Sequence, residues 1–191
     1  MYSIIRKIII FVVCKILFRV EYQNEENLEK YDKCLICPNH SRIYDPVFIY
    51  PKIENIYGMA KSELFKHKLV ENFLKYHNIF PVDREKTDTK SLRKALKLLK
   101  DNENIRFLIF PEGKVLKDKK QRGVVKNGAV YIAAMAKVPI IPIYITARPK
   151  YFSKVVVKFG KPIFYDKLQL KDKSKIEEAS KQLLKEIYTM E

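Results

Sequence analysis

The chain has 191 residues, 47% of them apolar and 31% charged, which is enough for one domain with its own hydrophobic core. Lysine and arginine number 38 against 22 aspartates and glutamates, so the formal net charge is +16 and a negatively charged partner is expected. The sequence has no zinc-finger, RRM or basic-zipper pattern and its lysines are dispersed, which disfavours nucleic acid relative to an anionic membrane, an acidic protein or a phosphate-bearing substrate.

The first apolar segment, residues 4–20, is interrupted by four basic side chains: Arg6, Lys7, Lys15 and Arg19. A membrane-spanning helix needs about 20 predominantly apolar residues, whereas the longest uninterrupted apolar run here is 8–14. The pattern is typical of an amphipathic helix at the membrane interface, and we assign residues 1–22 to it. A helix packed on the domain remains the alternative. A secretory signal is disfavoured because no Ala-x-Ala-like cleavage site follows.

The cysteines, Cys14, Cys34 and Cys37, are too few and too unevenly spaced for a disulfide framework, which favours a reducing compartment. Cys34 and Cys37 lie within an apolar run that predicts a strand. Two strand residues at this spacing point to opposite faces, so we interpret both as core thiols and not as ligands of a shared metal.

Short apolar runs predict six strands, at residues 34–37, 56–60, 79–82, 105–110, 140–145 and 155–159. Helical periodicity predicts helices that begin near Ser62 and after Thr89, and helices at 124–136 and 172–189. Strands that alternate with helices predict an α/β domain, a layered mixed β-sheet flanked by helices, preceded by the N-terminal amphipathic membrane-associating helix.

His40 and Asp45 form the first candidate catalytic pair. His40 follows the predicted strand 34–37, and strand ends of α/β sheets are where ligands bind. A separation of five residues would place the two side chains about 140° apart on an ideal helix, so they can meet only if residues 39–41 are not helical. In that arrangement Asp45 would orient the imidazole and raise the basicity of its other nitrogen. A helix-entry role for His40 remains the alternative.

Two further segments carry candidate binding residues. Glu112 and Gly113 follow the predicted strand 105–110, where a carboxylate can accept a substrate hydroxyl and a glycine permits close backbone approach. Arg84 follows the predicted strand 79–82, and a guanidinium suits a phosphate. The competing interpretations are an ordinary turn carboxylate for Glu112 and a surface ion pair with Asp83 or Glu85 for Arg84.

Five blocks of the sequence resemble the motifs of the bacterial lysophosphatidic acid acyltransferase family, the 1-acyl-glycerol-3-phosphate acyltransferases, within the glycerolipid acyltransferase superfamily. In chain order the blocks are Asn39-His40 with Asp45, then 60–65 (Ala-Lys-Ser-Glu-Leu-Phe), 81–84 (Pro-Val-Asp-Arg), 110–113 (Phe-Pro-Glu-Gly) and 138–142 (Val-Pro-Ile-Ile-Pro). The segment 160–163 resembles the usual ending of the family's domain. The resemblance identifies residues 23–191 as an acyltransferase domain.

The resemblance implies that His40 acts as general base on a glycerol hydroxyl, that Asp45 orients it, and that no acyl-enzyme forms. It further implies that Arg84 holds the acceptor phosphate and that Glu112 and Gly113 complete the acceptor pocket. Lys61 and Lys126 are weaker candidates for phosphate contacts. No metal or other cofactor is implied, because a thioester donor is already activated.

The implied product is phosphatidic acid for phospholipid biosynthesis, and the implied partners are acyl-CoA or acyl carrier protein as donor, a lysophospholipid acceptor and an anionic membrane surface. The expected location is the cytoplasmic face of the cell membrane. The sequence departs from the family where Lys114 and Val115 replace the usual Thr-Arg. Another lysolipid or an aminolipid acceptor is therefore the alternative within the enzyme class. A non-catalytic basic protein that binds anionic membrane or nucleic acid is the alternative outside it.

Overall fold

The computed structural model describes residues 2–83, 88–118, 122–166 and 172–191. Within these residues the centre is a seven-stranded sheet with the order β1-β7-β6-β2-β5-β3-β4. The strands are β1 (Arg19–Gln23), β2 (Lys33–Pro38), β3 (Ile56–Lys61), β4 (Ile79–Val82), β5 (Ile105–Leu108), β6 (Ile140–Ile145) and β7 (Lys154–Phe159). All six strands predicted from apolar runs are present, and β1 is an additional one.

The sheet is mixed, as predicted. Its neighbouring strands pair in parallel except β6 and β7, so β1 and β7 run opposite to the other five. The central strand β2 aligns Leu35 with Phe107 of β5 and with Ile140 of β6. The carboxyl ends of β2, β3, β4, β5 and β6 therefore meet at one edge of the sheet, and the turn that contains His40 begins there.

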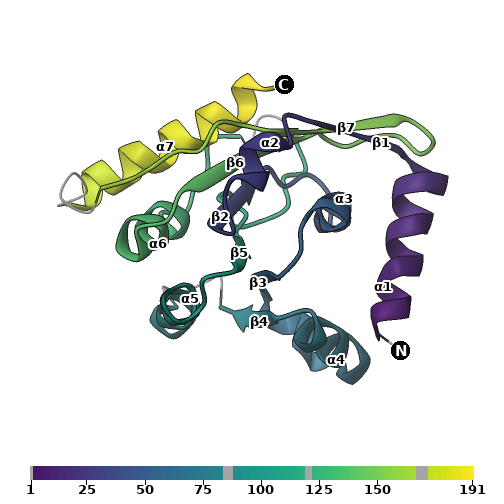
Figure 1. The fold of residues 1–191 in the computed structure, drawn as a ribbon, viewed down its shortest axis with the longest axis horizontal. Helices are drawn as coiled ribbons and strands as arrows, with labels where there is room; N and C mark the ends of the chain where they lie inside the picture. The colour runs from purple at the N-terminus through teal and green to yellow at the C-terminus, as the bar shows by residue number, and fades with distance from the viewer. Residues whose placement is uncertain (1, 84–87, 119–121, 167–171) are drawn as a thin grey trace.

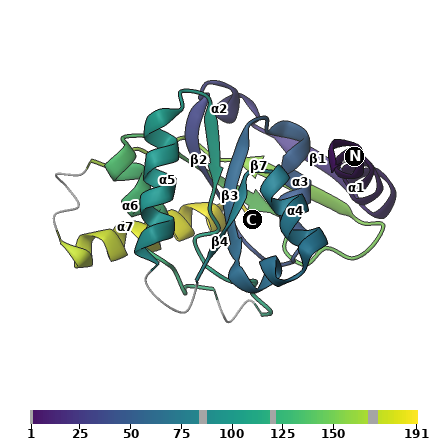
Figure 2. The same cartoon turned by 90° about the horizontal axis from the view of Figure 1, so that it is seen from below.

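Helices cover both faces of the sheet (Figures 1 and 2). Helices α5, α6 and α7 lie over one face, α1 and α3 lie toward the other, and α4 packs beside the edge strand β4. The helices are α1 (Tyr2–Phe11), α2 (Glu26–Glu29), α3 (Asp45–Ile49), α4 (Lys68–Tyr76), α5 (Thr89–Asp101), α6 (Gly128–Ala136) and α7 (Lys173–Thr189). The other helical segments are the π-helix η1 (Val12–Leu17) and the 3-10 helices η2 (Tyr50–Lys52) and η3 (Ser62–Lys66).

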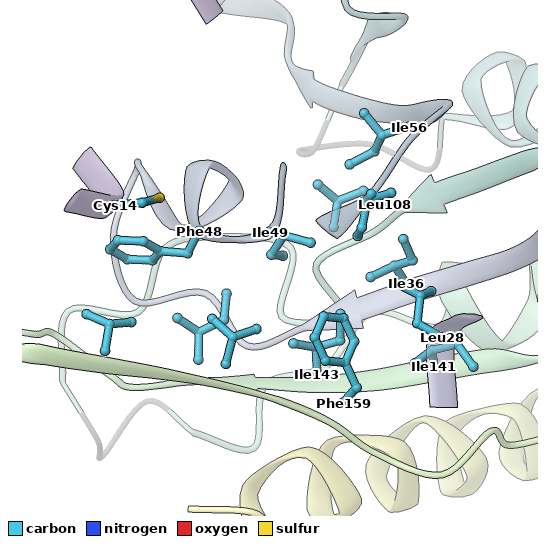
Figure 3. Packing of buried hydrophobic residues seen from close by; sticks show 14 of the residues in the cluster. Cys14, Leu28, Ile36, Phe48, Ile49, Ile56, Leu108, Ile141, Ile143 and Phe159 are labelled. Atoms are coloured by element: carbon cyan, nitrogen blue, oxygen red, sulfur yellow. The ribbon is translucent and has the colours of Figure 1, made fainter. Parts of the chain in front are cut away.

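The sheet separates two clusters of buried apolar side chains. Cys34 belongs to the cluster on the α3 face, part of which Figure 3 shows, and Cys37 belongs to the cluster beneath α5, α6 and α7. The alternation predicted for β2 is thus confirmed, because these two thiols point to opposite faces. Burial raises the pKa of the Cys34 thiol to about 12, so it stays protonated as a core group.

The helix boundaries follow from local capping. Asp88 accepts a hydrogen bond from the Ser91 amide (2.9 Å) at the start of α5, and Asp172 accepts one from the Lys175 amide (2.9 Å) at the start of α7. Lys137, with φ of 56°, ends α6 in the left-handed conformation. The start predicted for the last helix, near residue 172, is confirmed.

One predicted boundary is confirmed in part and two are wrong. A helical segment does begin at Ser62, but it is the 3-10 helix η3, and α4 begins only at Lys68 because His67 between them has an extended backbone (φ −95°, ψ 113°). The helix expected at 124 begins at Gly128, because the Lys126 amide donates to the carbonyl of Pro111 (2.7 Å) and holds the preceding segment as a loop. The strand expected at 105–110 ends at Leu108, since Phe110 begins a turn that the Gly113 amide closes.

The N-terminal segment is helical through Leu17, first as α1 and then as the π-helix η1. Its inner side packs on the α3 face, with Cys14 buried and Ile10, Val13 and Leu17 partly buried. Much of its apolar surface is exposed, including Ile4 (63%), Ile8 (56%) and Phe11 (59%). The domain boundary expected at residue 22 falls within β1, which pairs along its length with β7.

Candidate active site

The His40 and Asp45 side chains meet at the carboxyl end of β2. The strand ends at Pro38, and residues 41–44 form a turn before α3 begins at Asp45, so the condition required for their contact is met. Nδ1 of His40 lies 3.1 Å from Oδ2 of Asp45, and both side chains are buried. The same oxygen accepts hydrogen bonds from the amides of Ser41 (2.6 Å) and Arg42 (2.8 Å). The carboxylate thus holds both the ring and the turn.

This contact assigns the two ring nitrogens of His40 different roles. A carboxylate only accepts, so Nδ1 carries the proton that it donates to Asp45, and the lone pair of the imidazole lies on Nε2. The Phe110 ring stacks on the imidazole, with centroids 3.9 Å apart and planes inclined by 23°. An oriented imidazole with one basic nitrogen can remove a proton from a hydroxyl.

The backbone around His40 is held on both sides. Its carbonyl accepts a hydrogen bond from the Leu116 amide (2.8 Å), and its amide donates to Oε2 of Glu112 (2.6 Å). The preceding Asn39 bonds through its side chain to the amide (2.7 Å) and the carbonyl (3.0 Å) of Ile145, which joins the end of β2 to the end of β6. These contacts fix the catalytic turn to the sheet.

Glu112 lies behind the turn. The side chain is buried (1% exposed), and its second oxygen, Oε1, accepts a hydrogen bond from the Tyr188 hydroxyl near the end of α7. Burial raises the pKa of Glu112 to about 7, although the hydrogen bonds from Tyr188 and His40 act in the opposite direction. The structure therefore places Glu112 where it supports His40 from inside the protein, and not on the wall of the neighbouring cavity.

That cavity has a volume of about 530 Å³ and a mostly apolar lining. Its walls come from the carboxyl ends of β4 and β5 and from the first turns of α5, α6 and α7. Phe110 belongs to the lining and its ring also stacks on His40, so this one residue contacts both the cavity and the imidazole. A cavity of this size and polarity suits an elongated apolar group.

Gly113 and Lys126 both line the cavity. Gly113 has φ of +70°, and a Cβ atom there would lie 2.8 Å from Cγ of Lys126, so the position requires glycine for two reasons. Lys126 in turn packs against this turn, to which its amide is bonded through Pro111 (2.7 Å). These two predicted site residues are brought together, side by side.

Lys61 and Arg84 complete the set of predicted site residues. Lys61 ends β3, where its ammonium group pairs with Glu63 (2.7 Å), and it does not line the cavity. Arg84 lies outside the described residues, but its neighbours Val82 and Asp83 do line the cavity. Its predicted role in phosphate binding stays a prediction.

Sequence reasoning missed three residues of this site. Tyr188 bonds to Glu112 from the last helix, and Phe110 was assigned only to a strand end. The Arg148 amide donates to the Ser41 hydroxyl (3.0 Å), while its guanidinium donates to the carbonyl of Lys117 (2.6 Å) beside the turn. The sequence around Tyr188 and Arg148 carries no motif, whereas Phe110 could have been found from its place in the Phe-Pro-Glu-Gly block.

The model of the family described as Acyltransferase matches residues 19–146, which contain the His40 turn, Glu112 and most of the cavity. The chain belongs to this acyltransferase family. Among the curated relatives of this acyltransferase chain is the 1-acyl-sn-glycerol-3-phosphate acyltransferase of Bacillus subtilis (strain 168), 38% identical over 125 residues that cover 64% of this chain and 60% of that protein.

The enzyme of the same name from Streptococcus pneumoniae (strain ATCC BAA-255 / R6) is 28% identical over 171 residues, which cover 85% of this chain and 62% of that protein. The chain thus spans about 60% of the length of these relatives. The crystal structure of the 1-acyl-sn-glycerophosphate acyltransferase PlsC from Thermotoga maritima shares the fold, with a TM-score of 0.69 and 21% identity over 99% of this chain and 78% of that one. The resemblance inferred from the five motifs is confirmed.

Among the described residues, no group of three or more histidine, cysteine, aspartate or glutamate side chains is arranged to hold a metal ion. No described helix has both the length and the apolar character needed to cross a bilayer.

Proposed function

We propose that this acyltransferase-family chain transfers a fatty acyl group from an acyl thioester to the free hydroxyl of 1-acyl-glycerol-3-phosphate, forming phosphatidic acid for phospholipid biosynthesis. The observation that carries the proposal is the contact between Nδ1 of His40 and Asp45 (3.1 Å), which leaves Nε2 as the base. The names of the curated relatives support the acceptor.

In the proposed reaction, Nε2 of His40 removes the proton from the acceptor hydroxyl while the oxygen attacks the thioester carbonyl. The carbon–sulfur bond then breaks, and the protonated imidazole returns its proton to the departing thiolate. Asp45 stabilises the positive charge of the imidazolium throughout, since its oxygen already faces Nδ1. No covalent bond to the protein is needed, because the thioester is activated before it binds.

The substrate groups can be assigned to places around this base. The apolar cavity of about 530 Å³ suits an acyl chain of donor or acceptor, and Lys126 on its wall can contact a phosphate. Arg84, Gly113 and Lys61 remain the further candidates for contacts to the acceptor. The donor is acyl-CoA or acyl carrier protein, and both carry the negative charge that a chain of net charge +16 attracts.

The N-terminal segment is the proposed membrane anchor, at the cytoplasmic face. Its exposed side chains Ile4, Ile8 and Phe11 form an apolar surface that water does not favour. Phe18, which follows this segment, packs against Tyr44 of the catalytic turn, with ring centroids 5.6 Å apart. The proposed anchor is therefore joined through Phe18 to the turn that carries His40.

The test measures thiol release from acyl-CoA, and separately from acyl carrier protein, with 1-acyl-glycerol-3-phosphate as acceptor. The His40→Ala variant should lose at least about 1,000-fold in rate, since both general-base catalysis and hydroxyl orientation disappear. His67→Ala, which removes an exposed histidine, is the matched control and should keep the rate of the unchanged protein. Acceptor-dependent release that survives His40→Ala would contradict the mechanism.

A second acceptor class follows from Lys114 and Val115. These residues replace the Thr-Arg pair usual in the family, and Lys114 is exposed beside Gly113. A panel of lysolipids and aminolipids in competition with 1-acyl-glycerol-3-phosphate distinguishes the two acceptor classes. Turnover of another acceptor in preference to 1-acyl-glycerol-3-phosphate would replace the proposed substrate while keeping the role of His40.

A further inference from the structure

A buried carboxylate connects the last helix to the catalytic residue. The Tyr188 hydroxyl donates to Oε1 of Glu112, and Oε2 of the same carboxylate accepts from the His40 amide (2.6 Å). Tyr188 lies in the last turns of α7, outside residues 19–146 that match the family model. Two hydrogen bonds therefore link the end of α7 to the backbone that carries the imidazole.

The position of the Tyr188 ring is fixed by its surroundings. The guanidinium of Arg122 lies 4.1 Å from the ring centroid and also pairs with Glu191, at 2.5 and 3.1 Å. On the inner side of the helix, Leu184 and Ile187 are buried in the cluster beneath α6. The Arg122 guanidinium on one side and the buried face of α7 on the other thus hold the phenol oxygen against Glu112. A tyrosine that served only for apolar packing would not need its hydroxyl held in this way.

We propose that Tyr188 is a positioning residue for acyl transfer, which acts through Glu112 to hold the His40 backbone and so aim its imidazole at the acceptor hydroxyl. The inference rests on the proposed function in taking His40 as the base. Asp45 fixes the rotation of the ring, whereas Glu112 and Leu116 fix the backbone from which the ring extends. A small shift of that backbone would displace Nε2 from the hydroxyl.

The strength of the link depends on the charge of Glu112. Burial raises its pKa to about 7, and the hydrogen bond from Tyr188 favours the ionised form, which is the better acceptor for the His40 amide. The other charged groups that act on it are Asp45, which raises its pKa, and Arg122, which lowers it. Without the phenol hydroxyl, Glu112 would stay protonated to higher pH and would hold His40 less firmly.

The experiment compares Tyr188→Phe with Tyr165→Phe. Both changes remove one phenol hydroxyl that donates a hydrogen bond, but the Tyr165 hydroxyl donates to the carbonyl of Ala179 in α7 (3.4 Å) and not to a site residue. The first readout is exchange of the His40 amide hydrogen, measured by NMR on the full chain in detergent micelles. The second is the pH dependence of kcat for thiol release.

For Tyr188→Phe we expect faster exchange of the His40 amide hydrogen. We also expect the acidic limb of the pH–rate profile, where kcat rises with pH, to move to higher pH by about one unit. A shift of that size corresponds to the loss of one hydrogen bond to a charged group. The rate should fall about five-fold at pH 7 and recover near pH 9, where Glu112 is ionised in either protein. Tyr165→Phe should change neither readout. In a Glu112→Gln background, Tyr188→Phe should no longer move the limb.

Equal His40 exchange in the two variants, or an unmoved limb in Tyr188→Phe, would overturn the positioning role. A rate loss in Tyr188→Phe that is the same at every pH would also overturn it, because a general loss of packing is not relieved by ionising Glu112. If the unchanged protein released no thiol from either donor with any acceptor of the panel, the proposed function would fail, and the exchange measurement would still decide whether Tyr188 holds His40.

Discussion

Asp45 and Glu112 are two buried carboxylates with different tasks around one histidine. Asp45 accepts three hydrogen bonds on a single oxygen, at 2.6 to 3.1 Å, and so fixes the imidazole together with the turn. Glu112 accepts from the backbone of His40 and from a phenol, in a site where burial favours its protonated form. The catalytic residue is therefore held through both its ring and its main chain.

The raised pKa of Glu112 has a consequence for stability. The folded protein binds this proton more tightly than the unfolded chain, so the stabilisation is complete below about pH 4.5 and is lost as the pH rises through about 7. Over that range the wild-type free energy of unfolding should fall by about 3 kcal/mol more than that of Glu112→Gln, which does not titrate. Urea unfolding at pH 5 and pH 8 measures the difference. Equal pH dependence in the two proteins would mean that Glu112 does not titrate in this range.

At the scale of elements, the turn after β5 joins the catalytic residue to the cavity. Phe110 stacks on His40, Pro111 accepts a hydrogen bond from the amide that precedes α6, and Gly113 packs on Lys126. Strand β5 pairs with β2 on one side and with β3 on the other, so the turn that follows β5 lies beside the end of β2. Displacement of the turn should therefore affect both substrate binding and the base.

Gly113→Ala tests that turn. The new Cβ would lie 2.8 Å from Cγ of Lys126 and would occupy a backbone with φ of +70°, so we expect a loss of stability of about 1–2 kcal/mol and a higher KM for the acceptor. Gly123→Ala is the matched control, because Gly123 also has a positive φ (+106°) but no atom lies within 4 Å of the added Cβ. Thermal unfolding and acceptor titrations compare the two. If both variants show the same KM, the contact with Lys126 does not shape the acceptor site.

At the scale of the whole molecule, charge and exposed apolar surface act together. The net charge is +16. Helix α1, which lies to one side of the sheet (Figure 1), carries exposed isoleucines and a phenylalanine. Anionic lipid would attract the charge, and the bilayer interface would bury the apolar side chains. Binding to vesicles should therefore require both features.

The double variant Ile4→Glu, Ile8→Glu should bind phosphatidylglycerol vesicles at least about ten-fold more weakly, because each buried isoleucine contributes about 1.5–3 kcal/mol. Its unfolding temperature should not change, since both side chains are exposed in the folded protein. Phe164→Glu is the matched control, with an exposed (63%) apolar side chain that lies outside the N-terminal segment. Vesicle co-sedimentation measures the binding. Equal binding of the double variant and the control would exclude α1 as the anchor.

The sequence by itself determined the elements and the catalytic pair. Local apolar periodicity located six strands, and the Asn-His-x-x-x-x-Asp block located His40 and Asp45, because these signals lie within a few residues of one another. Element boundaries differ from the prediction where a contact between distant residues sets them. Helix α6, for example, begins at Gly128 because the hydrogen bond from the Lys126 amide to Pro111 holds the preceding residues as a loop.

Only the tertiary structure decided how these pieces meet. Residues 19–23 were assigned to the end of an N-terminal helix and its boundary, yet they form β1 because β7 offers an open edge for parallel pairing. Glu112 was expected at the acceptor pocket, but a partner in α7 and the His40 amide hold it in the interior. Such hydrogen bonds join residues far apart in the chain, and no local pattern encodes them, since their partners become neighbours only when the sheet has formed.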